Sequence, residues 1–425
     1  MKPEHSGRAR QHAGWLGCVP YLFFVLFALL SQRVARAQTN DVYFRSWRWI
    51  DASGGAQANA IAGATVALKD DGAGLEANPA TLATFSRSAL SLSFSSSRSA
   101  QTSLGDVIQP RGSLDDLSAA FKLGTHVGVA VFRSEPLARH IDLAPLPAAD
   151  GTYDDGSLSA VSTDMGLAVA RSFGSHLALG VALTHCHLAF AAHYSRLTPQ
   201  LPAVLEVGAA GGDDRFAPSF GALLSLGRRV QLGLSQRVGV RWQIQRVAIS
   251  PLMSLTLDSG TPLPIERPAT TSLGAHVSLS QRLALSAQVD YLRFASVAPG
   301  VLEGYRELGV PRQAWEPRAA IELALPTRSF SVLLRTGVHW MPRPTRIESV
   351  TPPAPSLPGV AAWAPPPPAS LFQRDAEDAV VRRLDSRSSF GAGLALVTRS
   401  GLRLDLALRA GAEQPALLAG TSWRF

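Results

Sequence analysis

The sequence predicts an all-β protein, a 14-stranded antiparallel transmembrane β-barrel with an N-terminal hatch, or plug, in its lumen. Three observations predict it: alternation of apolar and polar residues in successive segments, links that alternate between short and long, and an aromatic C-terminal residue. Charged residues make up only 17% of the chain, below the ~25% usual in soluble proteins. Apolar residues spread through alternating segments are typical of a membrane barrel.

Residues 1–37 have the pattern of a secretory signal peptide. A basic start is followed by the apolar run 21–30 and by an A-x-A cleavage site at 35–37. The apolar run is too short for a spanning helix, which needs about 20 residues. We therefore expect the mature chain to begin at Gln38, and an uncleaved anchor is the alternative.

The rest of the chain divides into a hatch at 38–87 and a barrel at 88–425, which includes a long Pro-rich outer loop at 343–385. After cleavage Cys186 is the one remaining cysteine in the sequence, so neither an intramolecular disulfide nor a Cys-based zinc site is possible. The small, scattered excess of positive charge does not indicate nucleic acid.

Strand patterns recur downstream of residue 88. In 401–409, for example, leucine at every second position alternates with Arg403, Asp405 and Ala407, which a strand would place on opposite faces. The predicted strands are 88–97, 115–123, 126–134, 160–173, 176–190, 215–227, 230–246, 270–279, 282–296, 314–325, 329–342, 386–399, 401–409 and 416–425.

The links between these segments favour a barrel over a soluble sandwich. Short links such as 124–125, 174–175 and 228–229 alternate with long ones such as 135–159 and 191–214. Short turns on one side and long loops on the other are typical of outer-membrane barrels. Barrel closure also leaves no unpaired strand edge in lipid.

The C-terminus supports this interpretation. Trp423 and Phe425 share one face of the last predicted strand with apolar residues, a pattern that resembles the signal read by the barrel assembly machinery. Other aromatic residues fall at strand ends, where they predict girdles at the two interfaces. They are Phe173 and Phe330 at the short turns and Trp242, Tyr291, Trp315 and Trp340 at the long loops.

The N-terminal part of the mature chain resembles the FadL/TodX outer-membrane transporters for long-chain fatty acids and other hydrophobic compounds. The resemblance rests on the small-residue run 60–64, then Asp70 and Asp71, then the triplet Asn78-Pro79-Ala80 before the first strand. Pro79 favours an extended Asn78, whose side chain closes a turn.

The resemblance extends over most of the mature chain, through the strand count and the segments 216–238 and 314–343. It implies a hatch that holds the Asn-Pro-Ala triplet near a lumenal ligand site. It also implies capture of a hydrophobic ligand by outer loops and its passage by the hatch or through a gap in the wall. The triplet is followed by Thr81 where many relatives have Gly, a departure that bears on the substrate.

Alternation places a mixed set of charges in the lumen. The structural interpretation is that they form ion pairs with one another and with the hatch. The functional alternative is that some of the arginines bind a ligand carboxylate through two parallel hydrogen bonds. The residues chosen as lumenal candidates are Arg237, Arg241, Arg335 and Asp290.

Two further groups have alternative interpretations. The Pro-rich segment 351–372 is either a stiff exposed arm or a hydrophobic capture site with Trp363, Leu371 and Phe372 as contacts. His185 and His187 share a strand face, but a lipid-interface position explains them better than a metal site. No phosphate loop, zinc signature or nucleophile motif appears in the sequence, and we expect neither enzyme activity nor a cofactor.

We therefore expect a monomeric outer-membrane channel for passive uptake of hydrophobic small molecules, surrounded by outer-membrane lipid. The alternative is a PorV-like, non-transporting platform for protein export or assembly. A third class, the general polar porin, is disfavoured by the predicted hatch. An apolar lumenal pocket beside Asn78 and Pro79 would favour transport, and a filled lumen would favour the platform.

Overall fold

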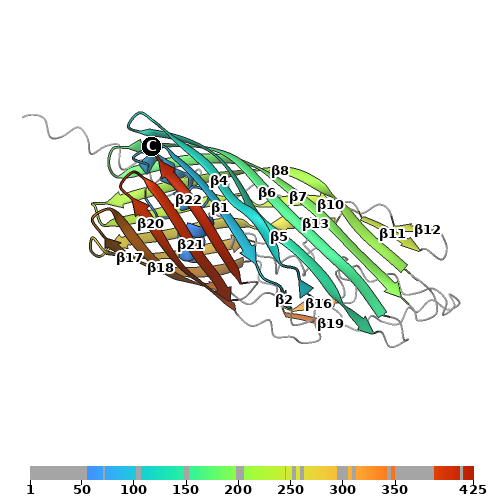
Figure 1. Ribbon diagram of the computed structural model, residues 1–425. Helices are drawn as coiled ribbons and strands as arrows, with labels where there is room; N and C mark the ends of the chain where they lie inside the picture. Colours follow the sequence, from blue (N-terminus) through green and yellow to red (C-terminus); the bar gives the residue numbers. More distant parts are fainter. Residues whose placement is uncertain are drawn as a thin grey trace, which may run out of the picture. The chain divides into compact units, whose positions relative to one another are not determined.

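The computed structural model describes residues 55–69, 72–101, 107–147, 153–197, 205–244, 246–250, 255–258, 263–293, 305–308, 313–341, 346–349, 387–411 and 415–425. In these ranges, fourteen antiparallel strands close into one barrel, as the sequence predicts (Figure 1). The predicted hatch residues 38–54, 70 and 71 lie outside the described residues.

The wall consists of β1 (Ala89–Ser97), β4 (Arg111–Leu123), β5 (Val127–Pro147), β6 (Tyr153–Phe173), β7 (Leu177–Leu197), β8 (Leu205–Leu226), β9 (Val230–Arg237), β14 (Ala269–Ser278), β15 (Leu283–Arg293), β17 (Gln313–Pro326), β18 (Phe330–Met341), β20 (Arg387–Thr398), β21 (Leu402–Gly411) and β22 (Ala416–Arg424). Each pairs with the next along the chain, and β1 also pairs with β22, which closes the ring.

The shorter strands are β2 (Ala100–Gln101), β3 (Val107–Ile108), β10 (Val240–Ile244), β11 (Arg246–Ser250), β12 (Leu255–Asp258), β13 (Leu263–Arg267), β16 (Tyr305–Leu308) and β19 (Arg346–Ser349). Before the wall come α3 (Gly55–Ala60) and two short 3₁₀ helices, η1 (Gly72–Gly74) and η2 (Pro79–Thr84). Within the described part of the chain, no helix has the length and apolar character needed to span a membrane.

The wall is apolar outside and polar inside. In β21 the four leucines at even positions are 38–51% exposed, whereas Arg403 and Asp405 are buried. The same inverted alternation occurs in β7 and β17. A soluble protein would bury the leucines instead, so this pattern indicates a wall that faces lipid.

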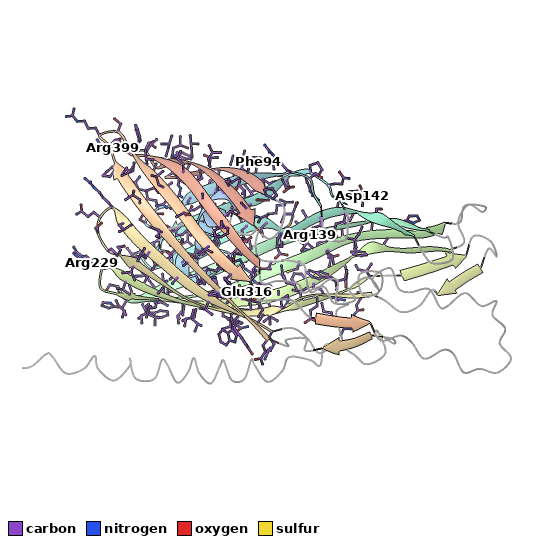
Figure 2. The ribbon with its side chains drawn as sticks, turned by 90° about the horizontal axis from the view of Figure 1, so that it is seen from below. Phe94, Arg139, Asp142, Arg229, Glu316 and Arg399 are labelled. Atoms are coloured by element: carbon purple, nitrogen blue, oxygen red, sulfur yellow. The ribbon has the colours of Figure 1, made fainter. Side chains whose placement is uncertain are left out.

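Exposed aromatic residues lie at both ends of the wall. Phe173, Phe330 and Phe425 lie at the short-turn end, and Trp315 and Trp340 lie at the opposite end; all five are exposed. Figure 2 shows the two ends, with Arg229 and Arg399 at the short turns and Asp142 towards the opposite end. These positions agree with the predicted girdles.

Four strands extend further than predicted. β5 to β8 continue through much of the segments expected to be the outer links 135–159 and 191–214 (Figure 1). Gly, Pro and Asp in these segments weaken the strand signal. The backbone ladder nevertheless continues, for example between Leu158 and Ala192 and between Ala191 and Ala210.

The prediction of one strand over 230–246 is wrong. The wall strand β9 ends at Arg237, and β10 pairs with β13 in a separate two-stranded sheet. A Cβ on Gly239 would lie 2.9 Å from the amide nitrogen of Ala269, so glycine permits the chain to leave the wall here. Trp242 is consequently buried, and its predicted girdle position is also wrong.

Candidate functional site

Residues 55–69 and 72–85, together called here the inner segment, pack on the inward face of the wall. α3 contacts β20, β21 and β22, and η2 contacts β6, β7 and β8. Because these strands lie on different sides of the ring, the inner segment occupies the lumen at its level. Most of its side chains are buried.

The inner segment approaches the wall most closely at glycines. A Cβ on Gly128 would lie 2.6 Å from the carbonyl oxygen of Leu82, and one on Gly180 would lie 2.5 Å from the amide nitrogen of Ala80. Similar close approaches occur at Gly221, Gly233, Gly337 and Gly391. These wall glycines let the backbone of the inner segment touch the backbone of the strands.

Asn78 is the central residue of the inner segment. Its backbone is extended, its Oδ1 accepts from the Ala80 amide at 3.0 Å, and it caps η2, in agreement with the predicted Asn-Pro turn. Its Nδ2 donates to the carbonyl oxygens of Val66 at 2.8 Å and Ala222 at 3.0 Å. One buried amide thus links both halves of the inner segment to the wall.

We expect Asn78→Ala to loosen the inner segment. Loss of the cap costs about 1 kcal/mol, and two buried carbonyl groups lose a donor. The variant should show faster amide exchange at 61–68 and 78–85 by mass spectrometry in detergent, with wall strands unchanged. Thr84→Ala, which removes a hydrogen bond to Thr81 in the same helix, is the control. Equal exchange in Asn78→Ala and wild type would contradict this role for Asn78.

One side of the lumen binds the inner segment through charged and polar groups. Arg318 donates through Nε to Asp290 at 2.7 Å and through Nη1 to the carbonyl oxygen of Ala62 at 3.0 Å. The Val66 amide donates to the Gln288 side chain at 3.1 Å.

On the neighbouring strands Arg335 pairs with Glu322 and Asp405. Asp290 and Arg335 are therefore already held in ion pairs.

The other side of the lumen is apolar. Leu75, Leu82 and Phe85 of the inner segment pack on small and aromatic residues of the wall, including Ala130 and Phe132. At about 25 cal/mol per Å² of apolar surface, this burial holds η2 against the wall, together with the hydrogen bond from Lys122 Nζ to the carbonyl oxygen of Ala83 at 3.0 Å. The inner segment is thus held by hydrogen bonds to Arg318 and Gln288 on one side and mainly by apolar packing on the other.

Arg237 links the inner segment to the wall, and Arg241 does not. Arg237 donates to the carbonyl oxygen of Glu76 at 2.8 Å. Burial raises the pKa of the Glu76 carboxyl, an effect opposed by Arg237. Arg241 lies in β10, away from the wall ladder, so the prediction that both arginines line one wall strand is wrong.

The β10–β13 sheet covers the inward face of β7 and β8. Trp242 donates to the carbonyl oxygen of Cys186 at 3.1 Å. Arg267 donates to Asp164 at 2.5 Å and to the Cys186 sulfur at 2.8 Å, and its guanidinium lies 5.8 Å from the Trp242 ring centre. This sheet further narrows the lumen beside the inner segment.

Two cavities that described residues line beside the inner segment are small. One of about 30 Å³ lies between Thr65, Ser235 and Arg318, and one of about 10 Å³ lies between Glu76, Pro136 and Arg267. By the usual volume needed for a buried water, they hold one or two water molecules each. Neither accommodates a hydrophobic ligand while the inner segment is in this position.

The wall ladder is interrupted between β4 and β5. The two strands pair only from Asp116 and Ser134 towards the short turn. β4 has a bulge at Asp115, opposite β1, and β5 has one between Ser134 and Leu137, opposite β6. Backbone pairing to β5 resumes where the Gln109 amide donates to the carbonyl oxygen of His140 at 2.8 Å and β3 joins the ladder. The facing stretches 111–115 and 135–139 between the two paired parts are called here the β4–β5 seam.

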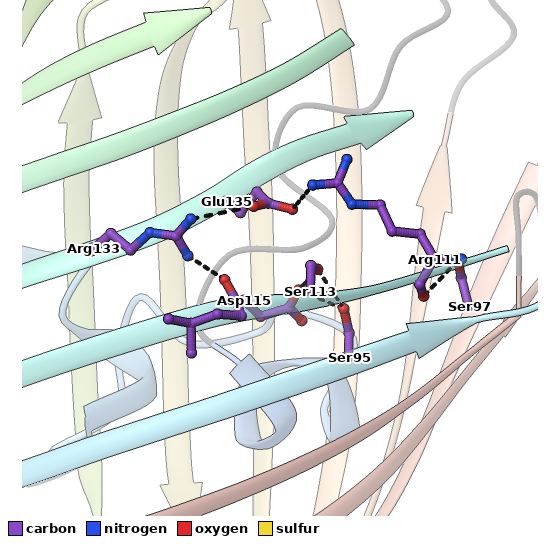
Figure 3. Close-up of polar contacts among 8 residues, drawn as sticks. Ser95, Ser97, Arg111, Ser113, Asp115, Arg133 and Glu135 are labelled. Atoms are coloured by element: carbon purple, nitrogen blue, oxygen red, sulfur yellow. Dashed lines mark hydrogen bonds and ion pairs between the residues drawn. The ribbon is translucent and has the colours of Figure 1, made fainter. Parts of the chain in front are cut away.

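Side chains bridge the β4–β5 seam (Figure 3). Glu135 forms ion pairs with Arg111 at 3.2 Å and with Arg133 at 3.3 Å, and Arg133 also donates to the carbonyl oxygen of Leu114. Beside them, Asp115 accepts from Ser95 at 2.7 Å and from Ser113 at 3.2 Å. Charged side chains thus take the place of ladder bonds in this part of the wall.

Several predicted site residues lie outside the described residues: Asp70 and Asp71 of the hatch, and Trp363, Leu371 and Phe372 of the capture loop. At the C-terminus, the Trp423 and Phe425 rings lie 5.0 Å apart on the exposed face, and their role as an assembly signal stays a prediction.

His185 and His187 both contact Asp214 Oδ1, at 3.1 Å and 2.9 Å. Among the described residues, no group of three or more His, Cys, Asp or Glu side chains is arranged to hold a metal ion.

Sequence reasoning missed Arg111, Arg133, Glu135 and Glu76. The seam residues fell at the end of a predicted strand and in a predicted loop. A signal was present in Glu135-Pro136, because proline within a strand pattern indicates a bulge or an edge. Two adjacent aspartates at 115–116 likewise break the alternation of β4.

No family model and no curated protein sequence matches this chain. Solved structures do resemble it. The toluene transporter TodX of Pseudomonas putida has 14% identity and a TM-score of 0.58 over 89% of this chain and 100% of that chain. The toluene transporter TbuX of Ralstonia pickettii has 12% identity and the same TM-score over 88% and 99%.

A Pseudomonas aeruginosa FadL homologue has 13% identity and a TM-score of 0.58 over 88% of this chain and 98% of that chain. At these identities the likeness shows a shared fold, which is the fold of the family that the sequence resembles.

Proposed function

We propose that this chain is an outer-membrane channel for the passive uptake of hydrophobic small molecules such as long-chain fatty acids. The observation that carries the proposal is the interruption of the wall at the β4–β5 seam, beside an inner segment that packs on the inward face of the wall. A fold shared with proteins named as toluene transporters supports it. The apolar outer face of the wall supports the membrane location.

In this mechanism the inner segment acts as a hatch that directs the ligand sideways. The cavities beside it are too small for a ligand, so straight passage requires the hatch to move. A path through the seam would be shorter than one past the whole hatch. The cavity at Glu76 already reaches the seam, because Phe132 and Pro136 of β5 line it. A ligand captured by Trp363, Leu371 and Phe372 would leave the lumen there and enter the membrane.

The second function is a PorV-like platform for protein export or assembly. The closely fitted inner segment favours it, because a platform needs a sealed barrel and an external partner surface but no route through the lumen. In such a role the chain would bind an exported protein through its outer loops.

Uptake by purified protein distinguishes the two functions. Full-length protein in lipid vesicles that enclose a fatty-acid-binding fluorescent reporter should speed the arrival of oleate over protein-free vesicles. Triple replacement of Trp363, Leu371 and Phe372 by Ser keeps the loop length and should raise the half-saturating concentration several-fold. A Ser replacement of Trp340, an exposed ring on the outer face, is the matched control. Wild-type vesicles that take up oleate no faster than protein-free ones would favour the platform.

A further inference from the structure

Arg111, at the inward side of the β4–β5 seam, differs from the lumenal arginines Arg318 and Arg403. Arg318 and Arg403 are buried and hydrogen-bonded to carboxylates. The Arg111 side chain is 34% exposed, and among the described residues Glu135 is the partner of its guanidinium. A guanidinium carries five N–H donors, so most of the Arg111 donors are available to another group.

The link between Arg111 and Glu135 is itself incomplete. The Oε1 atom of Glu135 is buried and has no hydrogen bond among the described residues, although it lies 3.2 Å from Arg111 Nη2. The contact is therefore an ion pair without hydrogen-bond geometry, weaker than a bidentate pair. A carboxylate that approached with better geometry would compete for Arg111.

The two arginines that contact Glu135 lie on opposite faces of the wall. Arg111 has the parity of Ser113 and Asp115, and Asp115 is buried on the inward face. Arg133 alternates with the buried Phe132 and Ser134, so it has the outward parity. It is paired in register with Met165, which is 56% exposed in the apolar outer face.

Glu135 lies between these two arginines and is only 6% exposed. The seam therefore presents, in order from lumen to lipid, a guanidinium, a carboxylate and a second guanidinium. The bulge of β5 between Ser134 and Leu137 changes the direction of the side chain at 135, so that Glu135 reaches Arg111 as well as Arg133.

On the basis of the proposed function, we infer that the β4–β5 seam is a binding site for the carboxylate head group of an amphiphile, with Arg111 as the inward and Arg133 as the outward ligand group. The head group takes the place of Glu135 at Arg111 and then at Arg133. One carboxylate replaces another at each arginine in turn while Glu135 keeps its contact with the other arginine, so neither a guanidinium nor the buried Glu135 carboxylate is left unpaired, which would be costly in a low-dielectric wall.

The rest of such a ligand has an apolar path. Phe94 and Met165 are exposed on the outer face of β1 and β6, next to β4 and β5. A hydrocarbon chain that follows its head group through the seam would pass from Phe132 and Leu75, inside, to these side chains and lipid. The site therefore fits a long-chain acid better than an uncharged hydrocarbon.

The test compares a fatty acid with its ester in the same protein. Vesicles with full-length protein are loaded with reporters for oleate and for methyl oleate, and Arg111→Gln, Arg133→Gln and Glu135→Gln are compared with wild type. Each arginine variant should raise the half-saturating concentration of oleate by about tenfold, the loss of a hydrogen bond to a charged group, and leave methyl oleate unchanged. Glu135→Gln should lower the value for oleate, because the competing carboxylate is gone.

Arg229→Gln, in an exposed short turn, makes the same change of charge away from the seam and should behave as wild type. Equal loss of both ligands in the arginine variants, or no change for oleate, would overturn the carboxylate site while the proposed function stands. Wild-type vesicles that take up neither ligand would overturn the proposed function, and this inference with it.

Discussion

Gly221→Ala should open the lumen to small solutes. The new Cβ would overlap Asn78 Oδ1 and lie 2.9 Å from Pro79 Cδ. Overpacking of a fitted site costs about 1–3 kcal/mol, and here it also displaces the cap of η2 and the hydrogen bond to Ala222. The inner segment should therefore leave the wall at 78–82, and single-channel conductance in planar bilayers should rise from the closed level of wild type.

The matched control is Gly274→Ala. Gly274 is also a wall glycine beside the inner segment, but its nearest neighbours lie 3.4 Å from the added Cβ, at ordinary contact distance. Gly180→Ala, where the Cβ would meet Ala80 and Pro79, should reproduce the effect from the neighbouring strand. If Gly221→Ala and Gly180→Ala both fold and stay closed, the inner segment is not what seals the lumen.

Arg318→Ala should give the largest loss of stability among single lumenal substitutions. It leaves Asp290 and Glu316 buried without their guanidinium and removes the donor to Ala62. Loss of one partner of a buried ion pair costs about 3–5 kcal/mol. The midpoint of urea unfolding in detergent micelles, followed by the mobility shift of the folded barrel in gels, should fall accordingly.

The double variant Arg318→Met, Asp290→Leu separates charge from packing. With Arg318 and Asp290 both replaced, most of the stability should return, because Glu316 keeps its contact with His339 at 2.9 Å and apolar residues of similar volume often replace a buried pair at little cost. Arg229→Ala, in an exposed turn, should leave the midpoint within about 0.5 kcal/mol. A double variant as unstable as Arg318→Ala would show that the side-chain shape, and not the unpaired carboxylate, is responsible.

Alternation and link length predicted the fourteen wall strands because lipid and lumen impose opposite demands on alternate residues. These two patterns did not predict the structure correctly where a segment no longer lies between lipid and lumen. Val240 and Trp242 continue the alternation of β9, yet they belong to the separate β10–β13 sheet inside the barrel. The two-residue period of a strand does not distinguish a strand of the wall from one that lies inside it. The extensions of β5 to β8 carry weak patterns because Gly, Pro and Asp interrupt them, although they continue the ladder and bury Leu137, Ile141 and Leu158.

The candidate site was predictable only in part. Asn78 and Pro79 carry a local turn signal, so their conformation follows from neighbouring residues. Arg111 and Glu135 meet across two bulged strands, which depends on register that no single segment specifies. Arg267 and Asp164 are 103 positions apart in the chain and face each other only after the inner sheet has folded in.

The inner segment also bears on how the barrel forms. The ring closes between β1 and β22, the first and last wall strands. Closure therefore costs the conformational entropy of bringing together two strands separated by almost the whole wall sequence. α3 contacts β1 on one side and β20 to β22 on the other. A segment bound to β1 thus offers the arriving C-terminal strands a surface before the final ladder exists. Its removal should slow closure in refolding kinetics, because non-local pairing would have to begin unaided.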